Sequence, residues 1–259
     1  MQILLANDDG IEAPGLAALY KQLVQLGDVT VVAPADARSG VGHSITFRRP
    51  LEARRVTVDG LFTGYSVMGS PADCVKLAVL KLVESPVDLV VSGMNDGANV
   101  GINVYYSGTV AAAMEGAFLG LPAIAVSLAR ELPESAPMFD LGAQYAVEVI
   151  KRLLPLPCGD VININIPLLS RGRPRGVHVV PQSSTGFDEH YIEEMGRDGI
   201  RRFTLAGDHH LPDANETDLS GIEAGYITVT ALTPDMTQYR RTLELERVDW
   251  ACPMDPPDA

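Results

Sequence analysis

Two adjacent acidic residues, Asp8 and Asp9, follow the first apolar run of the chain, residues 3–6. This run predicts a buried parallel strand, and open α/β sheets bind ligands at the carboxyl ends of such strands. Neighbouring carboxylates repel each other, so a positive group is expected between them. A hard divalent cation, which prefers oxygen ligands, is the simplest such group. The alternative is a solvated turn that caps the following helix.

Two further polar loops follow predicted strands and are expected at the same edge of the sheet. The first contains Ser39 and the second contains Asn95. Their neutral oxygens would complete a site for an ion such as Mg²⁺, which keeps several waters and needs only one or two carboxylates. Taken singly, each residue is more simply explained as part of a turn. The shared sheet edge is what favours a metal site made of Asp8, Asp9, Ser39 and Asn95.

A possible anion site lies at Ser107, Gly108 and Thr109, where another helix is predicted to begin. The first turn of a helix presents free backbone N–H groups and the positive end of the helix dipole. An ordinary helix cap by Ser107 or Thr109 is the simpler alternative. Between Lys81 and Arg130 the chain has no lysine or arginine. A phosphate at this helix would therefore be neutralised by a metal and by backbone amides, which makes the predicted activity strictly metal-dependent.

The histidines carry less information. His43 follows Ser39 in the same loop and could protonate a leaving group or contact a substrate, although a single loop histidine is more often structural. His190, His209 and His210 lie in a polar stretch without the spacing of a zinc site, so no zinc site is predicted there.

The elements that must position these residues alternate along the first part of the chain. Apolar strands separated by helices predict a doubly wound, mostly parallel α/β sheet with right-handed crossovers. Pro71, next to the capping residue Ser70, marks the start of one of these helices. The predicted strands are residues 3–6, 29–33, 87–91, 124–127 and 161–166, the helices are 14–26, 71–83, 109–119 and 139–154, and 46–67 contains a hairpin.

The pattern changes after residue 176. Strand-like pieces at 177–180 and 226–230 enclose a stretch rich in Asp, Glu, His and Arg. We interpret residues 1–176 as the catalytic core and residues 177–259 as an extended hairpin arm and C-terminal segment, all within a single structural unit. The arm is expected to form contacts between subunits, and residues 253–259 are expected to be disordered.

Composition limits the function classes. The net charge of −13 disfavours duplex nucleic acid as a partner. Three cysteines without paired spacing suit a reducing compartment. No signal-type segment begins the chain, and the longest apolar stretch, residues 118–129, is short and contains Pro122, so no membrane contact is expected. These features predict a cytoplasmic protein.

Several of these segments together resemble the SurE (survival protein E) family, over about residues 1–130. The matching segments are Asn7-Asp8-Asp9-Gly10, Arg38-Ser39-Gly40, Gly69-Ser70-Pro71-Ala72-Asp73-Cys74-Val75, Asp88-Leu89-Val90-Val91-Ser92-Gly93-Met94-Asn95 and Tyr106-Ser107-Gly108-Thr109-Val110. The resemblance implies a Rossmann-like fold whose C-terminal extension is exchanged between subunits of a homodimer or homotetramer. It also implies metal-dependent hydrolysis of nucleoside 5′- or 3′-monophosphates.

By the same resemblance, Asp8, Asp9, Ser39 and Asn95 would bind one Mg²⁺ or Mn²⁺ per subunit. The phosphate would contact Asn95, Ser107, Gly108 and Thr109. One departure is Asn103, where the family pattern leads us to expect an aspartate.

In this hypothesis Asp8 or Asp9 orients the attacking water or takes its proton. The choice between them stays open, as do the preferred base, 5′ or 3′ preference, and activity on polyphosphate or oligonucleotide ends. A phospho-accepting receiver domain is the main alternative, but no acceptor aspartate ends the second or third predicted strand. A dinucleotide oxidoreductase would need a G-x-G-x-x-G motif after the first strand, and none is present. A non-enzymatic nucleotide-binding module is the remaining alternative.

Overall fold

A computed structural model describes residues 1–130, 138–186, 188–196, 198–207, 215–248 and 250. These residues form a nine-stranded sheet in the order β3-β4-β2-β1-β5-β6-β7-β11-β8. The six strands from β4 to β7 are parallel, whereas β3 and β11 run antiparallel to their inner neighbours. The strands are β1 Gln2–Ala6, β2 Asp28–Pro34, β3 Ala53–Val58, β4 Phe62–Val67, β5 Leu89–Asp96, β6 Ala123–Leu128, β7 Val161–Ile166, β8 Val177–Val179 and β11 Ile227–Leu232.

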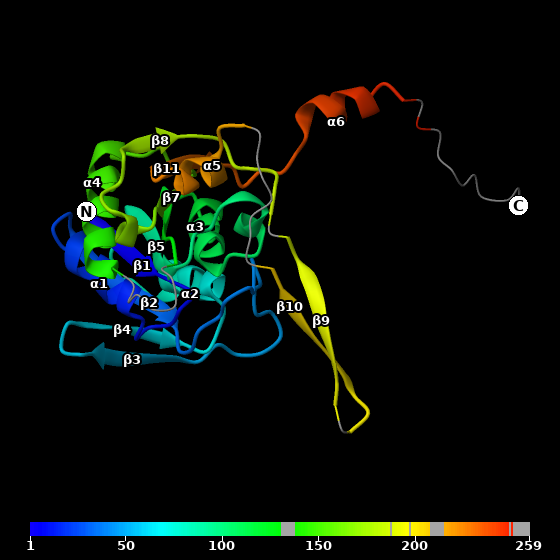
Figure 1. The fold of residues 1–259 in the computed structure, drawn as a ribbon. Helices are drawn as coiled ribbons and strands as arrows, with labels where there is room; N and C mark the ends of the chain where they lie inside the picture. Colours follow the sequence, from blue (N-terminus) through cyan, green and yellow to red (C-terminus); the bar gives the residue numbers. More distant parts are fainter. Residues whose placement is uncertain (131–137, 187, 197, 208–214, 249, 251–259) are drawn as a thin grey trace, which may run out of the picture.

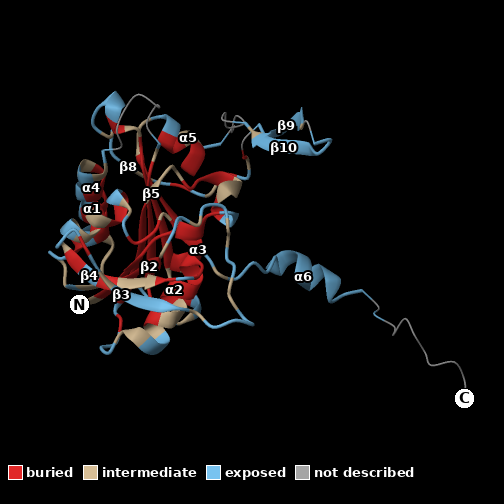
Figure 2. Cartoon of the chain, turned by 90° about the horizontal axis from the view of Figure 1, so that it is seen from below, coloured by how far each residue is buried: buried red, intermediate tan, exposed pale blue. Residues whose placement is uncertain are grey.

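Helices cover both faces of this sheet (Figure 1). Helices α1 (Pro14–Leu23) and α4 (Phe139–Leu153) pack against each other and share one hydrophobic core with the sheet. Helices α2 (Pro71–Leu77), with its π-helical continuation η1 (Ala78–Leu82), and α3 (Gly108–Phe118) share the second core. Figure 2 shows the buried strands between these two layers. The predicted doubly wound, Rossmann-like architecture is confirmed.

Local sequence signals account for most element boundaries. Ser70 accepts a hydrogen bond from the Asp73 N–H, and the Asp73 side chain accepts one from the Ser70 N–H, so the predicted start of α2 is a complete capping box. The predicted hairpin is β3–β4, and α1 ends at Leu23, three residues before the predicted end. The largest difference is β5, which continues through Asp96 where a loop was expected, because Asn95 and Asp96 still pair with β6.

The C-terminal part of the chain divides between the body and two projections. β8, β11 and the short helix α5 (Asp218–Glu223) complete the sheet and its cover, so the predicted boundary at residue 176 does not coincide with a boundary of the sheet. The antiparallel hairpin β9 (His190–Met195) and β10 (Arg201–Ala206) projects from the body, as does α6 (Tyr239–Leu245) (Figure 1). The predicted disorder of residues 253–259 lies outside the described residues. No described helix has both the length and the apolar composition needed to cross a membrane.

Candidate functional site

The acidic pair, Asp8 and Asp9, lies just after β1. The Asn7 side chain fixes the turn by donating to the Gly10 carbonyl at 2.8 Å and accepting from the Gly10 N–H at 3.2 Å. Asp8 is only 4% exposed, and its carboxylate accepts a hydrogen bond from the Thr109 hydroxyl. A Cβ at Gly108 would lie 2.7 Å from the Asp8 Cβ, so glycine is what lets the start of α3 approach this carboxylate.

Both carboxyl groups are held in an environment that disfavours their charge. Burial raises the pKa of Asp8 to about 6, with the hydrogen bond from Thr109 opposing the shift and the Asp9 charge adding to it. Burial also raises the pKa of Asp9, and the nearby Asp96 carboxylate contributes, while the Asp96 N–H at 3.3 Å and Arg130 act in the opposite direction. A bound cation would remove this penalty.

A cavity of about 970 Å³ opens above the acidic pair. It brings together most of the predicted site residues, which come from separate segments of the chain. Asp8, Asp9, Ser39, Asn95 and Ser107 all line it. The volume falls within the range of about 300–1,000 Å³ that is typical of small-molecule sites.

The donor atoms present fit a hard cation. The Asn95 amide nitrogen donates to the Gly97 carbonyl at 2.7 Å, which leaves its amide oxygen as the atom available to a ligand. Ser39 is exposed, and the main-chain bond from the Arg38 N–H to the Asp8 carbonyl, at 2.7 Å, holds its loop beside the acidic pair. Two carboxylates, an amide oxygen and a hydroxyl form an all-oxygen set suited to Mg²⁺ or Mn²⁺. No group of three or more His, Cys, Asp or Glu side chains in the described ranges could hold a metal, so the neutral oxygens are essential to this fit.

Ser107, at the start of α3, was predicted either to cap the helix or to help bind an anion, and its position is compatible with both roles. Its hydroxyl accepts from the Val110 N–H at 3.1 Å and therefore caps the helix, while the residue also lines the cavity. Thr109 is fully buried and engages Asp8. A role of Ser107, Gly108 and Thr109 in phosphate binding stays a prediction.

Sequence reasoning did not anticipate several residues at this cavity. Arg130 and Arg171 line it, as does the half-exposed ring of Tyr106. Arg130 follows β6, which lies beside β5, and its Nε is 3.7 Å from Asp96 Oδ2. The stretch between Lys81 and Arg130 has no basic residue, but the cavity does have basic side chains, because Arg130 and Arg171 line it. The signal was available, because Arg130 closely follows a predicted strand.

Asn103, the departure from the family pattern, also lines the cavity. Its amide nitrogen is buried and has no hydrogen-bond partner among the described residues. Such a donor is costly unless a ligand or water satisfies it.

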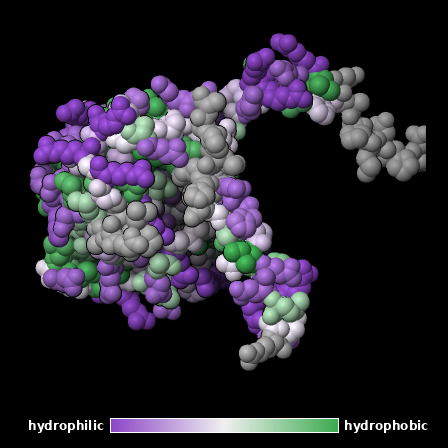
Figure 3. All heavy atoms as spheres, viewed as in Figure 1, coloured by the Kyte–Doolittle hydropathy of each residue, from purple (hydrophilic) through white to green (hydrophobic). Residues whose placement is uncertain are grey.

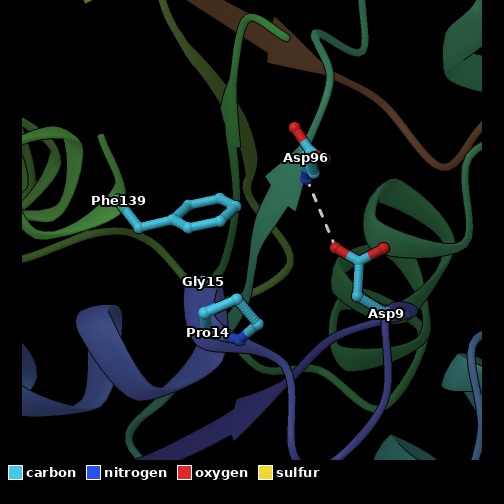
Figure 4. Close-up of a pocket in the computed structure, with 5 residues that line it drawn as sticks. All are labelled: Asp9, Pro14, Gly15, Asp96 and Phe139. Carbon is cyan, nitrogen blue, oxygen red and sulfur yellow. Dashed lines mark hydrogen bonds between the residues drawn. The ribbon is translucent and has the colours of Figure 1, made fainter. Parts of the chain in front are cut away.

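A second cavity, of about 380 Å³, borders the acidic pair on the side of α1 and α4 (Figure 4). Pro14, Gly15 and Phe139 line it together with Asp9 and Asp96, whose main-chain N–H donates to Asp9. Glycine is required at position 15, because a Cβ there would lie 2.1 Å from the Met94 carbonyl oxygen. Asp9 and Asp96 thus line both cavities.

His43 lies apart from these groups. Its Nε2 is 2.8 Å from Glu115 Oε2 on α3, and its ring stacks on Phe118 at 5.1 Å between centroids. His43 is not one of the described residues that line the larger cavity. A substrate contact by His43 stays a prediction.

Three comparisons relate the chain to known proteins. The family model described as Survival protein SurE matches residues 3–189. A 5′-nucleotidase SurE from Rhodopirellula baltica is 44% identical over 256 residues, covering 96% of this chain and 98% of that protein. A 5′-nucleotidase SurE from Syntrophus aciditrophicus is 43% identical over 243 residues, covering 92% of this chain and 90% of that protein. The crystal structure of the SurE protein from Aquifex aeolicus has a TM-score of 0.80 at 37% identity, covering 95% of this chain and 98% of that chain.

Proposed function

This chain belongs to the SurE family, and from that premise we propose that it hydrolyses nucleoside 5′- and 3′-monophosphates with one divalent cation bound at the acidic pair. Relatives named 5′-nucleotidases, 41–44% identical, support a 5′-nucleotidase, which is a hydrolase. They do not support a receiver domain. The observation that carries the proposal is the acidic pair itself: two adjacent carboxyl groups with raised pKa values line a cavity large enough for a nucleotide.

The cation would be held by Asp8, Asp9, Ser39 and Asn95. When bound, Mg²⁺ or Mn²⁺ supplies a Lewis acid for a phosphoryl oxygen and lowers the pKa of a water molecule.

The chain's own residues would activate the attacking water and bind the phosphate. Asp8 is fixed on one side by Thr109, whereas Asp9 is the more exposed of the two carboxylates. Either can orient the attacking water or accept its proton. Ser107 already accepts from the N–H groups of Val110 and Ala111. The N–H of Gly108 and the amide nitrogen of Asn103, which has no hydrogen-bond partner among the described residues, would therefore be the donors for phosphate oxygens and would stabilise the charge of the transition state. In this proposal the amide of Asn103 makes a contact that an aspartate could not make.

The test is phosphate release from a panel of 5′- and 3′-nucleoside monophosphates. We expect turnover with Mg²⁺ or Mn²⁺, loss of turnover in EDTA, and recovery when either metal is restored. Undiminished hydrolysis in EDTA would contradict the cation, whereas binding of a nucleotide without any phosphate release would indicate a binding module.

We also propose that the projecting hairpin and α6 join copies of this chain in a homodimer or homotetramer. Figure 3 shows both segments standing away from the body, with hydrophobic side chains among largely hydrophilic ones. Apolar surface of this kind is typical of subunit contacts. The exposed apolar residues are Tyr191, Ile192, Met195, Ile200, Phe203 and Leu205 around the hairpin and Tyr239, Leu243 and Leu245 on α6.

Light scattering after size-exclusion chromatography tests this assembly. Phe203→Lys should shift the protein toward monomer, whereas Leu80→Lys, a matched change at an exposed apolar residue of the body, should not. A monomeric wild-type protein at micromolar concentration would contradict the proposal.

A further inference from the structure

The loop that carries Ser39 has no regular secondary structure between β2 and β3. Its position depends on contacts with the body on both sides of that residue. The Arg38 N–H donates to the Asp8 carbonyl at 2.7 Å, and the Gly42 N–H donates to the Tyr106 carbonyl at 3.0 Å. Further along, the Thr46 hydroxyl donates to Asp73 at 2.7 Å. These contacts on both sides of Ser39 restrict where it can lie.

A further contact between this loop and the body involves a buried carboxylate, Glu115. Glu115 lies on α3 and is only 2% exposed. It accepts hydrogen bonds from His43 at 2.8 Å and from Lys76 of α2 at 2.5 Å. Burial opposes the ionised form of Glu115, but the hydrogen bonds from His43 and Lys76, together with the electrostatic attraction of these two side chains, outweigh it and lower the pKa of the carboxyl group. The Phe118 ring stacks on the imidazole of His43.

The cluster of His43, Glu115, Lys76 and Phe118 joins the loop to α3, the helix whose start borders the larger cavity. Glu115 sits on the same helix as Gly108 and Thr109, which contact Asp8. His43 is four residues from Ser39 and next to Gly42. The hydrogen bond between His43 and Glu115 therefore fixes the loop relative to the helix start and the acidic pair.

Resting on the cation site proposed above, we infer that His43 is a positioning residue: its bond to Glu115 holds Ser39 at the cation, without contact between His43 and the substrate. Residues that orient a metal ligand commonly change metal affinity about 10- to 100-fold when they are removed. His43 acts on Ser39 only through the main chain between them and not by a direct contact, so we expect an effect on metal affinity at the lower end of that range.

The direct test is calorimetric titration of Mn²⁺ into the metal-free protein, without substrate. We expect His43→Ala to weaken Mn²⁺ binding about tenfold. His43→Gln should recover part of this loss, because its amide N–H can still donate to Glu115. At saturating Mn²⁺, kcat and KM of His43→Ala should both lie within about twofold of wild type, because the effect is on metal affinity.

The chain offers a matched control in His178, which lies on β8 and stacks on Tyr226 at 4.1 Å between ring centroids. His178→Ala should leave Mn²⁺ binding unchanged. If His43→Ala does not fold, Phe118→Leu tests the same cluster, since it removes the stacked ring but keeps the hydrogen bond. It should weaken Mn²⁺ binding by less than His43→Ala.

The outcomes separate the two proposals. A wild-type protein that does not bind Mn²⁺ overturns the cation site and this inference with it. Unchanged Mn²⁺ binding by folded His43 variants overturns this inference alone. If KM for the nucleotide then rises, His43 contacts the substrate; if only the melting temperature falls, its role is structural.

Discussion

Two polar regions lie at the same edge of the sheet and differ in how their polar groups are satisfied. The acidic pair contains two carboxyl groups whose pKa values are raised by burial. The second region, which we name the asparagine hub, consists of Asn99, Ser127, Asn163 and Asn165. The Asn99 N–H donates to Asn165 Oδ1 and its side-chain amide donates to Ser127 Oγ, both at 2.8 Å. The Asn163 amide donates to the Asn99 carbonyl at 2.8 Å.

This difference suggests different roles: the acidic pair carries the chemistry, and the asparagine hub supports the structure of the site. Neutral amides provide donors and acceptors to each other, so most of the hub is satisfied within the chain. Two neighbouring carboxylates have only acceptors and the same charge, so they cannot satisfy each other in this way, and a positive partner would stabilise them. The hub holds the backbone of the segment after β5, which leads to Asn103 and Ser107. In the function proposed above, the acidic pair is the part of the site where a bound cation would change the energetics.

The largest effect should follow removal of one negative charge from the acidic pair. We expect Asp8→Asn or Asp9→Asn to lower turnover at least 100-fold, or about 3 kcal/mol of activation free energy. Asp28→Asn, at an exposed residue at the start of β2, should have no effect on turnover. Near wild-type rates in the purified Asp8 or Asp9 variant, measured with saturating Mn²⁺, would contradict the assignment.

The substitution Asp8→Asn should also stabilise the metal-free protein. Because the pKa of Asp8 is raised from 3.8 to about 6 on folding, its contribution to stability is fully present below pH 3.8 and is lost as the pH rises through 6. A neutral amide in place of the carboxyl group avoids that loss. We expect a gain of about 3 kcal/mol in the free energy of unfolding at pH 7.5, from the difference between 3.8 and about 6 at about 1.4 kcal/mol per pKa unit.

Urea denaturation in EDTA measures this gain, which should disappear as the pH approaches 4. A metal-free Asp8→Asn protein that is less stable than wild type at pH 7.5 would show that the carboxylate is satisfied without a cation.

Cation affinity should depend on pH for the same reason. Protons compete with the cation for Asp8 below its pKa of about 6. Between pH 7.5 and pH 5 we therefore expect the apparent Kd for Mn²⁺ to rise about tenfold. Titration calorimetry at several pH values, corrected for buffer protonation, should also show proton release on binding near pH 6. A flat profile over this range would place the cation away from Asp8.

The sequence predicts the acidic pair better than the hub, because the acidic pair is marked by residues that are close together in the sequence and the hub is formed by residues that are far apart. Asp8 and Asp9 closely follow a buried apolar strand, and Ser70 and Asp73 cap a helix three residues apart, so both features are local. The hub joins Asn99 to Asn163 and Asn165, 64 and 66 residues away. Only the register of β6 and β7, which places Ser127 beside Asn165, brings its members together.

One local clue to the hub was present. The strand Val161–Ile166 alternates isoleucine with asparagine, although it is fully buried. Since parallel strands buried on both faces are usually apolar throughout, the two asparagines indicate a polar partner on one face. Other elements left weaker signals: β5 runs through a segment rich in Gly and Asn, and its pairing with β6 overrides the loop-like composition.

The smallest effect we predict is in the hub, and it should lack any dependence on metal or pH. Asn99→Ala removes the hydrogen bond to Ser127 and leaves that buried hydroxyl without this donor. We expect a loss of about 1 kcal/mol in the free energy of unfolding, typical of one buried hydrogen bond. The loss should be equal with Mn²⁺ and with EDTA, and at pH 5 and pH 7.5, because no titrating group of the hub changes charge. Urea denaturation under these four conditions checks it. A loss that grows when Mn²⁺ is present would mean that the hub responds to the cation, and the separation between scaffold and chemistry would then fail.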